Sequence, residues 1–112
     1  MNSKEYNDQI LTDCIKTYGA DAQVDMCLEE MSELTKALLK YRRKMALNKN
    51  QKVNPISGNV DLTKARKDII DELADVKIMC RQMEMIFHAE KEVEERVDFK
   101  INRQVQRLEK NN

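Results

Sequence analysis

An unbroken apolar pattern with the spacing of an α-helix runs through the first half of the chain. Apolar side chains recur there at alternating intervals of three and four residues: Val24, Cys27, Met31, Leu34, Leu38, Tyr41 and Met45. Because residues three and four apart lie on one face of a helix, this pattern predicts a long helix with one apolar seam. A seam without a break is typical of a helix that packs along its whole length against other helices.

A second pattern of the same kind follows later in the chain. Its apolar positions alternate at intervals of four and three residues: Ile69, Leu73, Val76, Cys80, Met83 and Phe87. Another apolar line lies beside it, formed by Ile70, Ala74, Met79 and Ile86. A helix with two apolar lines must contact more than one neighbour, so we expect it to be central in a helical bundle.

Weaker patterns before and after these two predict four helices in all, at about residues 3–18, 21–47, 61–87 and 89–110. Gly19 is expected to end the first helix. The one clear loop is predicted at about 48–60, where the periodicity is lost and Pro55 and Gly58 occur. We therefore predict an all-α fold, a single domain over residues 1–112 that forms a four-helix bundle with two long central antiparallel helices.

The composition supports this fold class and excludes several functions. Two Gly, one Pro and 4% aromatic residues are too few for the turns and strands of a β-sandwich or barrel. The 20 basic and 20 acidic residues cancel to zero net charge, so no overall field favours nucleic acid or an anionic membrane. No segment has the apolar length of a membrane span, and the first residues lack the apolar core of a secretory signal. We therefore expect a cytoplasmic protein without a nucleic-acid or membrane partner.

The three cysteines are widely spaced and include no Cys-x-x-Cys pair, so neither a disulfide framework nor a zinc site is expected. Cys27 and Cys80 fall on the two apolar seams. Both are predicted to be small core residues.

Two acidic pairs interrupt the apolar patterns. Glu30 and Glu33 lie in the first pattern, and Glu72 and Asp75 lie in the second. The members of each pair are three residues apart and border the apolar seam, so each pair occupies one edge of its helix. If the two helices pack with these edges together, four carboxylates converge, and a bound cation is needed to offset their charge. Single pairs of this kind are common on helix surfaces, so the prediction depends on their coincidence on the two most apolar helices.

The ligand types indicate which metal such a site would bind. A set of carboxylates without histidine or thiolate suits Mg²⁺, with Mn²⁺ as the alternative. A di-iron bundle is excluded because it needs a Glu-x-x-His motif on two helices. The only histidine, His88, is thirteen positions after Asp75 and is expected to be an ordinary residue at a helix end.

The segments that carry these acids, CLEEMSELTKALLKYRR and DIIDELADVKIM, resemble the MazG-like, all-α nucleoside triphosphate pyrophosphohydrolases. The resemblance extends over about residues 20–108 by element order. It implies that Mg²⁺ is bound by Glu30, Glu33, Glu72 and Asp75. It also implies that Glu29 is an additional acidic neighbour, which binds a further ion or orients water. The expected reaction is hydrolysis of a nucleoside or deoxynucleoside triphosphate to the monophosphate and pyrophosphate, in a homodimer or homotetramer.

Residue chemistry and the same resemblance suggest roles for further side chains. A carboxylate that the metal does not use can accept the proton of the attacking water, and we assign this catalytic role to Glu30 or Glu33. Lys100 and Arg103 match the basic stretch of the family, a Lys followed after two residues by Arg, and are expected to contact the phosphates. The alternative for these cations is a solvated basic face paired with nearby glutamates.

A second function remains open at this point, a non-catalytic helical bundle that oligomerises and binds a nucleotide or a protein partner. The intact set of four acids favours the enzyme, because a site without turnover has no need to keep acids on apolar helices. A nucleic-acid-binding bundle is disfavoured by the zero net charge and by the absence of a recognition-helix pattern.

Overall fold

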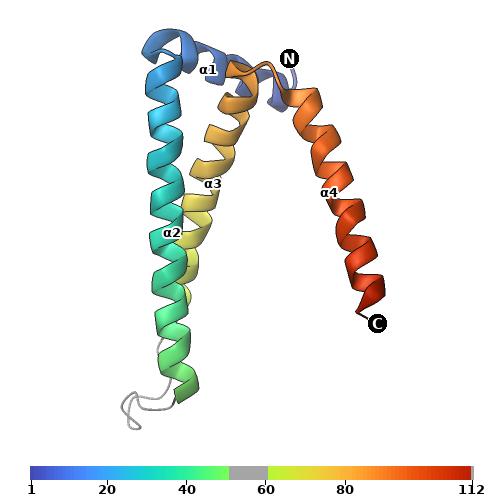
Figure 1. Cartoon of the computed structure of the whole chain (residues 1–112). Helices are drawn as coiled ribbons and strands as arrows, with labels where there is room; N and C mark the ends of the chain where they lie inside the picture. Colours follow the sequence, from blue (N-terminus) through green and yellow to red (C-terminus); the bar gives the residue numbers. More distant parts are fainter. Residues whose placement is uncertain (51–60, 112) are drawn as a thin grey trace.

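The computed structural model describes residues 1–50 and 61–111, with residues 48–50 described by their backbone alone. Over this part of the chain the fold is all-α, as predicted, and contains no strand. Figure 1 shows the four helices: α1 (Ser3–Tyr18), α2 (Ala20–Asn50), α3 (Thr63–Ile86) and α4 (Glu90–Lys110). Helix α2 extends to Asn50, so the first residues of the predicted loop are helical. The rest of that loop, 51–60, lies outside the described residues.

The two ends of α1 follow directly from the local sequence. At its start the side chain of Asn2 accepts a hydrogen bond from the backbone N–H of Glu5 at 2.8 Å, which caps the first turn. At its end Gly19 has a φ of 92°, and its N–H donates to the carbonyl of Ile15 at 2.9 Å. A positive φ is easily adopted only by glycine, so the predicted end of the helix at Gly19 is confirmed.

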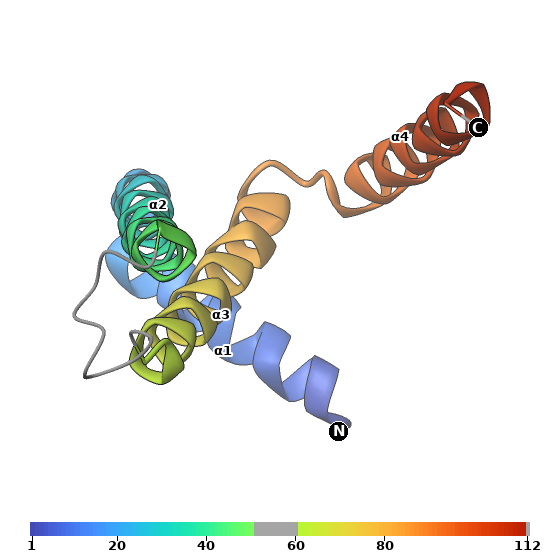
Figure 2. The same cartoon turned by 90° about the horizontal axis from the view of Figure 1, so that it is seen from below.

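Helices α2 and α3 form the centre of the fold. They run antiparallel and side by side, and α1 crosses one end of the pair (Figures 1 and 2). The most deeply buried described residues lie between them: Gln23, Cys27, Ala65, Met79 and Gln82. This is a small core for a chain of 112 residues.

Cys27 is buried as predicted, but Cys80 is exposed, which corrects the expectation that both thiols lie in the core. Cys80 belongs to the seam predicted for α3 together with Leu73 and Phe87, and these two side chains are exposed as well.

Helix α4 departs from a closed four-helix arrangement. Among the described helices its backbone packs only against α3, and it extends away from the α2–α3 pair (Figure 1). The chain therefore has the outline of an inverted V, with α2 and α3 as one arm, α4 as the other and α1 across the apex. The connection is short, and His88 lies at this corner with a φ of 50°. The expectation that His88 is an ordinary residue at a helix end agrees with this position.

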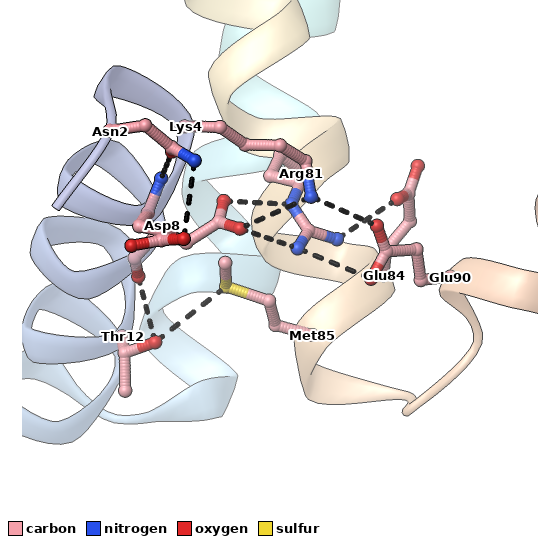
Figure 3. Close-up of polar contacts among 9 residues, drawn as sticks. Asn2, Lys4, Asp8, Thr12, Arg81, Glu84, Met85 and Glu90 are labelled. Atoms are coloured by element: carbon pink, nitrogen blue, oxygen red, sulfur yellow. Dashed lines mark hydrogen bonds and ion pairs between the residues drawn. The ribbon is translucent and has the colours of Figure 1, made fainter.

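A cluster of ion pairs fixes the corner between α1, α3 and α4 (Figure 3). The guanidinium of Arg81 donates two hydrogen bonds to the carboxylate of Asp8, both at 3.0 Å. It also lies 3.2 Å from an oxygen of Glu84 and 3.3 Å from an oxygen of Glu90. Lys4 approaches the second oxygen of Glu90 at 3.6 Å. The first turn of α4 is thus tied to both α1 and α3.

Candidate metal centre

Three of the four predicted acids meet at the edge of the contact between α2 and α3. Glu30 comes from α2, and Glu72 and Asp75 come from α3. Each offers one carboxylate oxygen, and these three oxygens lie within 4.8 Å of one another. Glu30 and Glu72 are half-buried, whereas Asp75 is exposed. The group is therefore open to solvent on the side of Asp75.

Glu72 is the most constrained of the three acids. Its Oε2 atom is buried and has no hydrogen-bond partner among the described residues. Burial raises the pKa of this carboxyl group, and the charges of Asp75 and Glu33 raise it further. A buried carboxylate oxygen without a donor is unfavourable unless a proton or a cation compensates it.

Glu30 is affected by its neighbours in the same way. Burial raises its pKa most, followed by the negative charges of Asp75, Glu72 and Glu29. Two half-buried carboxylates with raised pKa values, facing a third one, form a region of concentrated negative charge. Carboxylate oxygens are the ligands that a hard divalent cation such as Mg²⁺ prefers, so the type of these three side chains fits the predicted ion.

Glu33 is not part of the converging group. Its Oε1 atom forms an ion pair at 3.4 Å with Lys36, one turn further along α2. Glu33 and Glu72 both line a small cavity of about 210 Å³ next to the three acids. Glu33 is therefore close enough to raise the pKa of Glu72. Its carboxylate, however, faces the cavity and Lys36 and not the converging oxygens of the three acids.

The same cavity contains side chains that the sequence patterns did not single out. Lys36 and Lys40 enter it from α2, and Asp68 and Asp71 enter it from α3. The two lysines follow Glu33 by three and seven residues, which places them on its face of the helix. This spacing is the signal that could have identified them as cations beside the acidic group.

The other predicted site residues lie outside the group. Glu29 is exposed on α2 and acts on the site only through its charge on Glu30. Lys100 and Arg103 are exposed on α4. Since α4 leaves the α2–α3 pair, a single chain does not bring these two cations opposite the acids (Figure 1). Their role as phosphate contacts stays a prediction.

Comparisons of the chain with protein-family models, with curated proteins and with solved structures gave no match. The resemblance to MazG-like pyrophosphohydrolases therefore stays a prediction that depends on the acidic motifs. None of the described helices combines the length and the apolar character that crossing a membrane would require.

Proposed function

We propose that this chain is a Mg²⁺-dependent nucleoside triphosphate pyrophosphohydrolase that acts as a homo-oligomer. The observation that carries this proposal is the convergence of Glu30, Glu72 and Asp75 from two facing helices. The unpartnered oxygen of Glu72 supports it, because a carboxylate in that position gains from a nearby cation. The predicted MazG-like arrangement has its acids on the same two helices.

In this proposal Glu30, Glu72 and Asp75 hold the ion, and Glu33 lies beside them. When bound, Mg²⁺ would offset the charge of the triphosphate oxygens and lower the pKa of a water molecule. The cavity next to the acids supplies cationic donors on the same side of the helix pair. Lys36 and Lys40 are therefore candidates to bind phosphate oxygens there, in addition to Lys100 and Arg103 on α4.

Glu33 is the best candidate for the general base, since it lies beside the proposed ligands without being one of them. Its carboxylate accepts a proton from the attacking water as the water oxygen bonds to phosphorus. The bridging bond between the α- and β-phosphates breaks, and pyrophosphate leaves with the bonding electron pair. Lys36 lies beside this carboxylate, with its Nζ atom 3.4 Å from Oε1 of Glu33.

One observation favours the second function, a bundle that binds a nucleotide or a protein without turnover. Lys100 and Arg103, the phosphate contacts predicted from the sequence, lie on a helix that is apart from the acids within one chain. If turnover requires those two cations to neutralise the leaving pyrophosphate, a single chain can bind a ligand at the acids but cannot complete the reaction.

The test is a panel of nucleoside triphosphates, with standard and altered bases, given to the purified protein with Mg²⁺. We expect release of pyrophosphate, with loss of turnover in Asp75→Asn. Asp25→Asn is the matched control, because Asp25 is an exposed acid on the outer side of α2. Orthophosphate as the product would refute the reaction, and Mg²⁺-dependent nucleotide binding without turnover would establish the second function.

A further inference from the structure

The chain exposes far more surface than a compact monomer of its mass. Its accessible surface is 9152 Å², whereas a folded monomer of 13.2 kDa exposes about 6400 Å². Its radius of gyration is 19.2 Å, compared with about 13 Å for a compact chain of this length. The excess of roughly 2700 Å² is several times the ~800 Å² that one partner contributes to a standard interface.

Much of the exposed apolar surface lies on α4. One stripe of this helix consists of five apolar residues that are 40–64% exposed: Val93, Val97, Ile101, Val105 and Leu108. Glu90 lies on the same helical face, because Val97 and Ile101 follow it by seven and eleven residues. Since Glu90 contacts Arg81 of α3 and Lys4 of α1, this face is turned toward the inside of the V.

The opposite wall of the V carries an open groove between α1 and α3. It has a volume of about 970 Å³. Its apolar lining consists of Tyr6, Ile10, Leu11 and Ile78. Lys4 and Lys77 lie at its margins. Lys77 is two residues from Asp75, so the α1–α3 groove is on the opposite side of α3 from the acidic group.

The charges beside the two apolar surfaces are complementary. Glu94 and Asp98 border the α4 stripe on one side, and Lys100 and Arg107 border it on the other. The negative charges of Glu94 and Asp98 are opposite in sign to the lysines of the α1–α3 groove. Direct pairing of two α4 helices would leave that groove open in both copies. Lys4 and Arg81, which pair with Glu90, both line the α1–α3 groove, so the first turn of α4 is held at one end of the groove. From there the rest of α4 extends away from the chain's own α2–α3 pair (Figure 1), and its stripe does not cover the groove of the same chain.

We infer that two copies of the chain associate by exchange of α4. Each copy places the apolar stripe of its α4 in the α1–α3 groove of the other, with Glu94 and Asp98 near Lys77. This inference identifies the surfaces of the expected homo-oligomer and does not depend on the catalytic proposal. The apolar stripe and the groove both become buried, which supplies the core that one chain lacks.

The first test is the mass in solution, measured by light scattering and sedimentation at micromolar concentration. We expect a dimer, and we expect Ile101→Glu on the stripe and Ile78→Glu in the groove each to raise the dissociation constant by about 100-fold or more. Phe99→Glu is the matched control, because Phe99 is on the opposite face of α4 and is similarly exposed, 53% against 58% for Ile101. It should leave the dimer intact.

A charge exchange tests the pairing even if an apolar substitution unfolds the chain. Lys77→Glu alone and Glu94→Lys with Asp98→Lys alone should each weaken the homodimer, because like charges then face each other. A mixture of the two variants should restore a dimer, in which both groove contacts are complementary.

A monomeric wild-type chain would overturn the inference. So would a dimer that tolerates Ile101→Glu and Ile78→Glu but dissociates with Leu38→Glu, which alters the exposed apolar side of α2. A mixture of the two charge variants that stays as weak as either variant alone would also overturn it.

Discussion

Glu72 has one buried carboxylate oxygen that finds no hydrogen-bond partner in residues 1–50 and 61–111, next to the charges of Asp75 and Glu33. Without a cation, this arrangement weakens the folded state, because the unfolded chain exposes the same carboxylate to water. In the proposed metal centre, Glu30, Glu72 and Asp75 would together bind a cation that the unfolded chain cannot hold. Glu72 would thus destabilise the folded chain when no metal is bound and stabilise it when a metal is bound.

Replacing Glu72 by Gln should reveal this change of sign. In EDTA we expect Glu72→Gln to raise the melting temperature, because the amide removes one buried charge and keeps the shape. Mg²⁺ should stabilise the wild type by about 2.7 kcal/mol at a hundredfold excess over Kd, and the variant much less. Thermal melts followed by circular dichroism measure both effects. Glu92→Gln, an exposed change on α4, should alter neither, and an unchanged response to Mg²⁺ in Glu72→Gln would remove Glu72 from the metal centre.

The pH dependence of stability should follow from the raised pKa values of Glu30 and Glu72. The folded, metal-free chain binds protons more readily than the unfolded chain, so the free energy of unfolding rises as the pH falls through these values. The gain is complete below the ordinary pKa of glutamate. Asp8 acts in the opposite sense, because its pKa is lowered by Arg81, and its contribution is lost only as the pH falls through that lower value.

In EDTA we therefore expect the urea midpoint to be higher at about pH 5 than at about pH 7. The double variant Glu30→Gln, Glu72→Gln should lose most of this difference. A wild-type urea midpoint that is lower at about pH 5 than at about pH 7 would show that the acidic group is not crowded in the folded state.

How far these residues could be predicted depends on what helical spacing determines. Spacing places Glu30, Glu33, Glu72 and Asp75 on the inner edges of their helices, and three of them do converge. Spacing does not determine how far each helix is rotated about its own axis when the two helices pack. The contact of Glu33 with Lys36 follows from their spacing on α2, whereas the separation of Glu33 from the three converging oxygens depends on how α2 packs against α3.

At the scale of the helices, Arg81 connects three elements through its contacts with Asp8, Glu84 and Glu90. Asp8 and Arg81 are both largely shielded from solvent, at 27% and 22% side-chain exposure, so their two hydrogen bonds are stronger than those of a surface pair. The hydrogen bonds to Asp8 raise the pKa of Arg81, so the charged form of the guanidinium is favoured there.

Replacing Arg81 by Met should lower the free energy of unfolding by about 1–3 kcal/mol, because Asp8 and Glu84 lose a charged donor. We also expect α4 to lose its fixed direction, since Glu90 loses its main partner on α3. Chemical denaturation measures the first effect, and hydrogen exchange in the first turn of α4 measures the second. Lys67→Met, an exposed cation on the same helix, serves as the control. Equal stability and equal exchange in both variants would show that Arg81 does not organise the corner.

The helix boundaries could be predicted better than the direction of α4. Asn2 and Gly19 act on neighbouring residues, so their caps are visible in the local sequence. The direction of α4 depends on pairs such as Asp8 with Arg81, which are separated by 73 residues. Apolar periodicity on α4 indicates that the helix must be covered, but it does not tell whether the cover comes from the same chain.

For the whole molecule, the small set of buried side chains is difficult to reconcile with a stable monomer. No described side chain is large and fully buried, and long apolar residues on all four helices are exposed. Hydrophobic burial is the main favourable contribution to folding, so under the inferred exchange of α4 most of the stability would come from association.

Stability should therefore depend on protein concentration. If folding and dimer formation are coupled, raising the concentration by a factor of about a hundred stabilises the folded dimer by about 2.7 kcal/mol, because dissociated and unfolded chains are disfavoured by mass action. This corresponds to a rise of about 5–10 °C in Tm for an assembly of two chains of this length. Calorimetry of the wild type over that range measures the shift, and Phe99→Glu should show the same one. Ile101→Glu should melt at a lower temperature that is nearly independent of concentration. A wild-type Tm that does not change with concentration would mean that one chain completes its own core, with α4 folded back upon the helices it leaves in Figure 1.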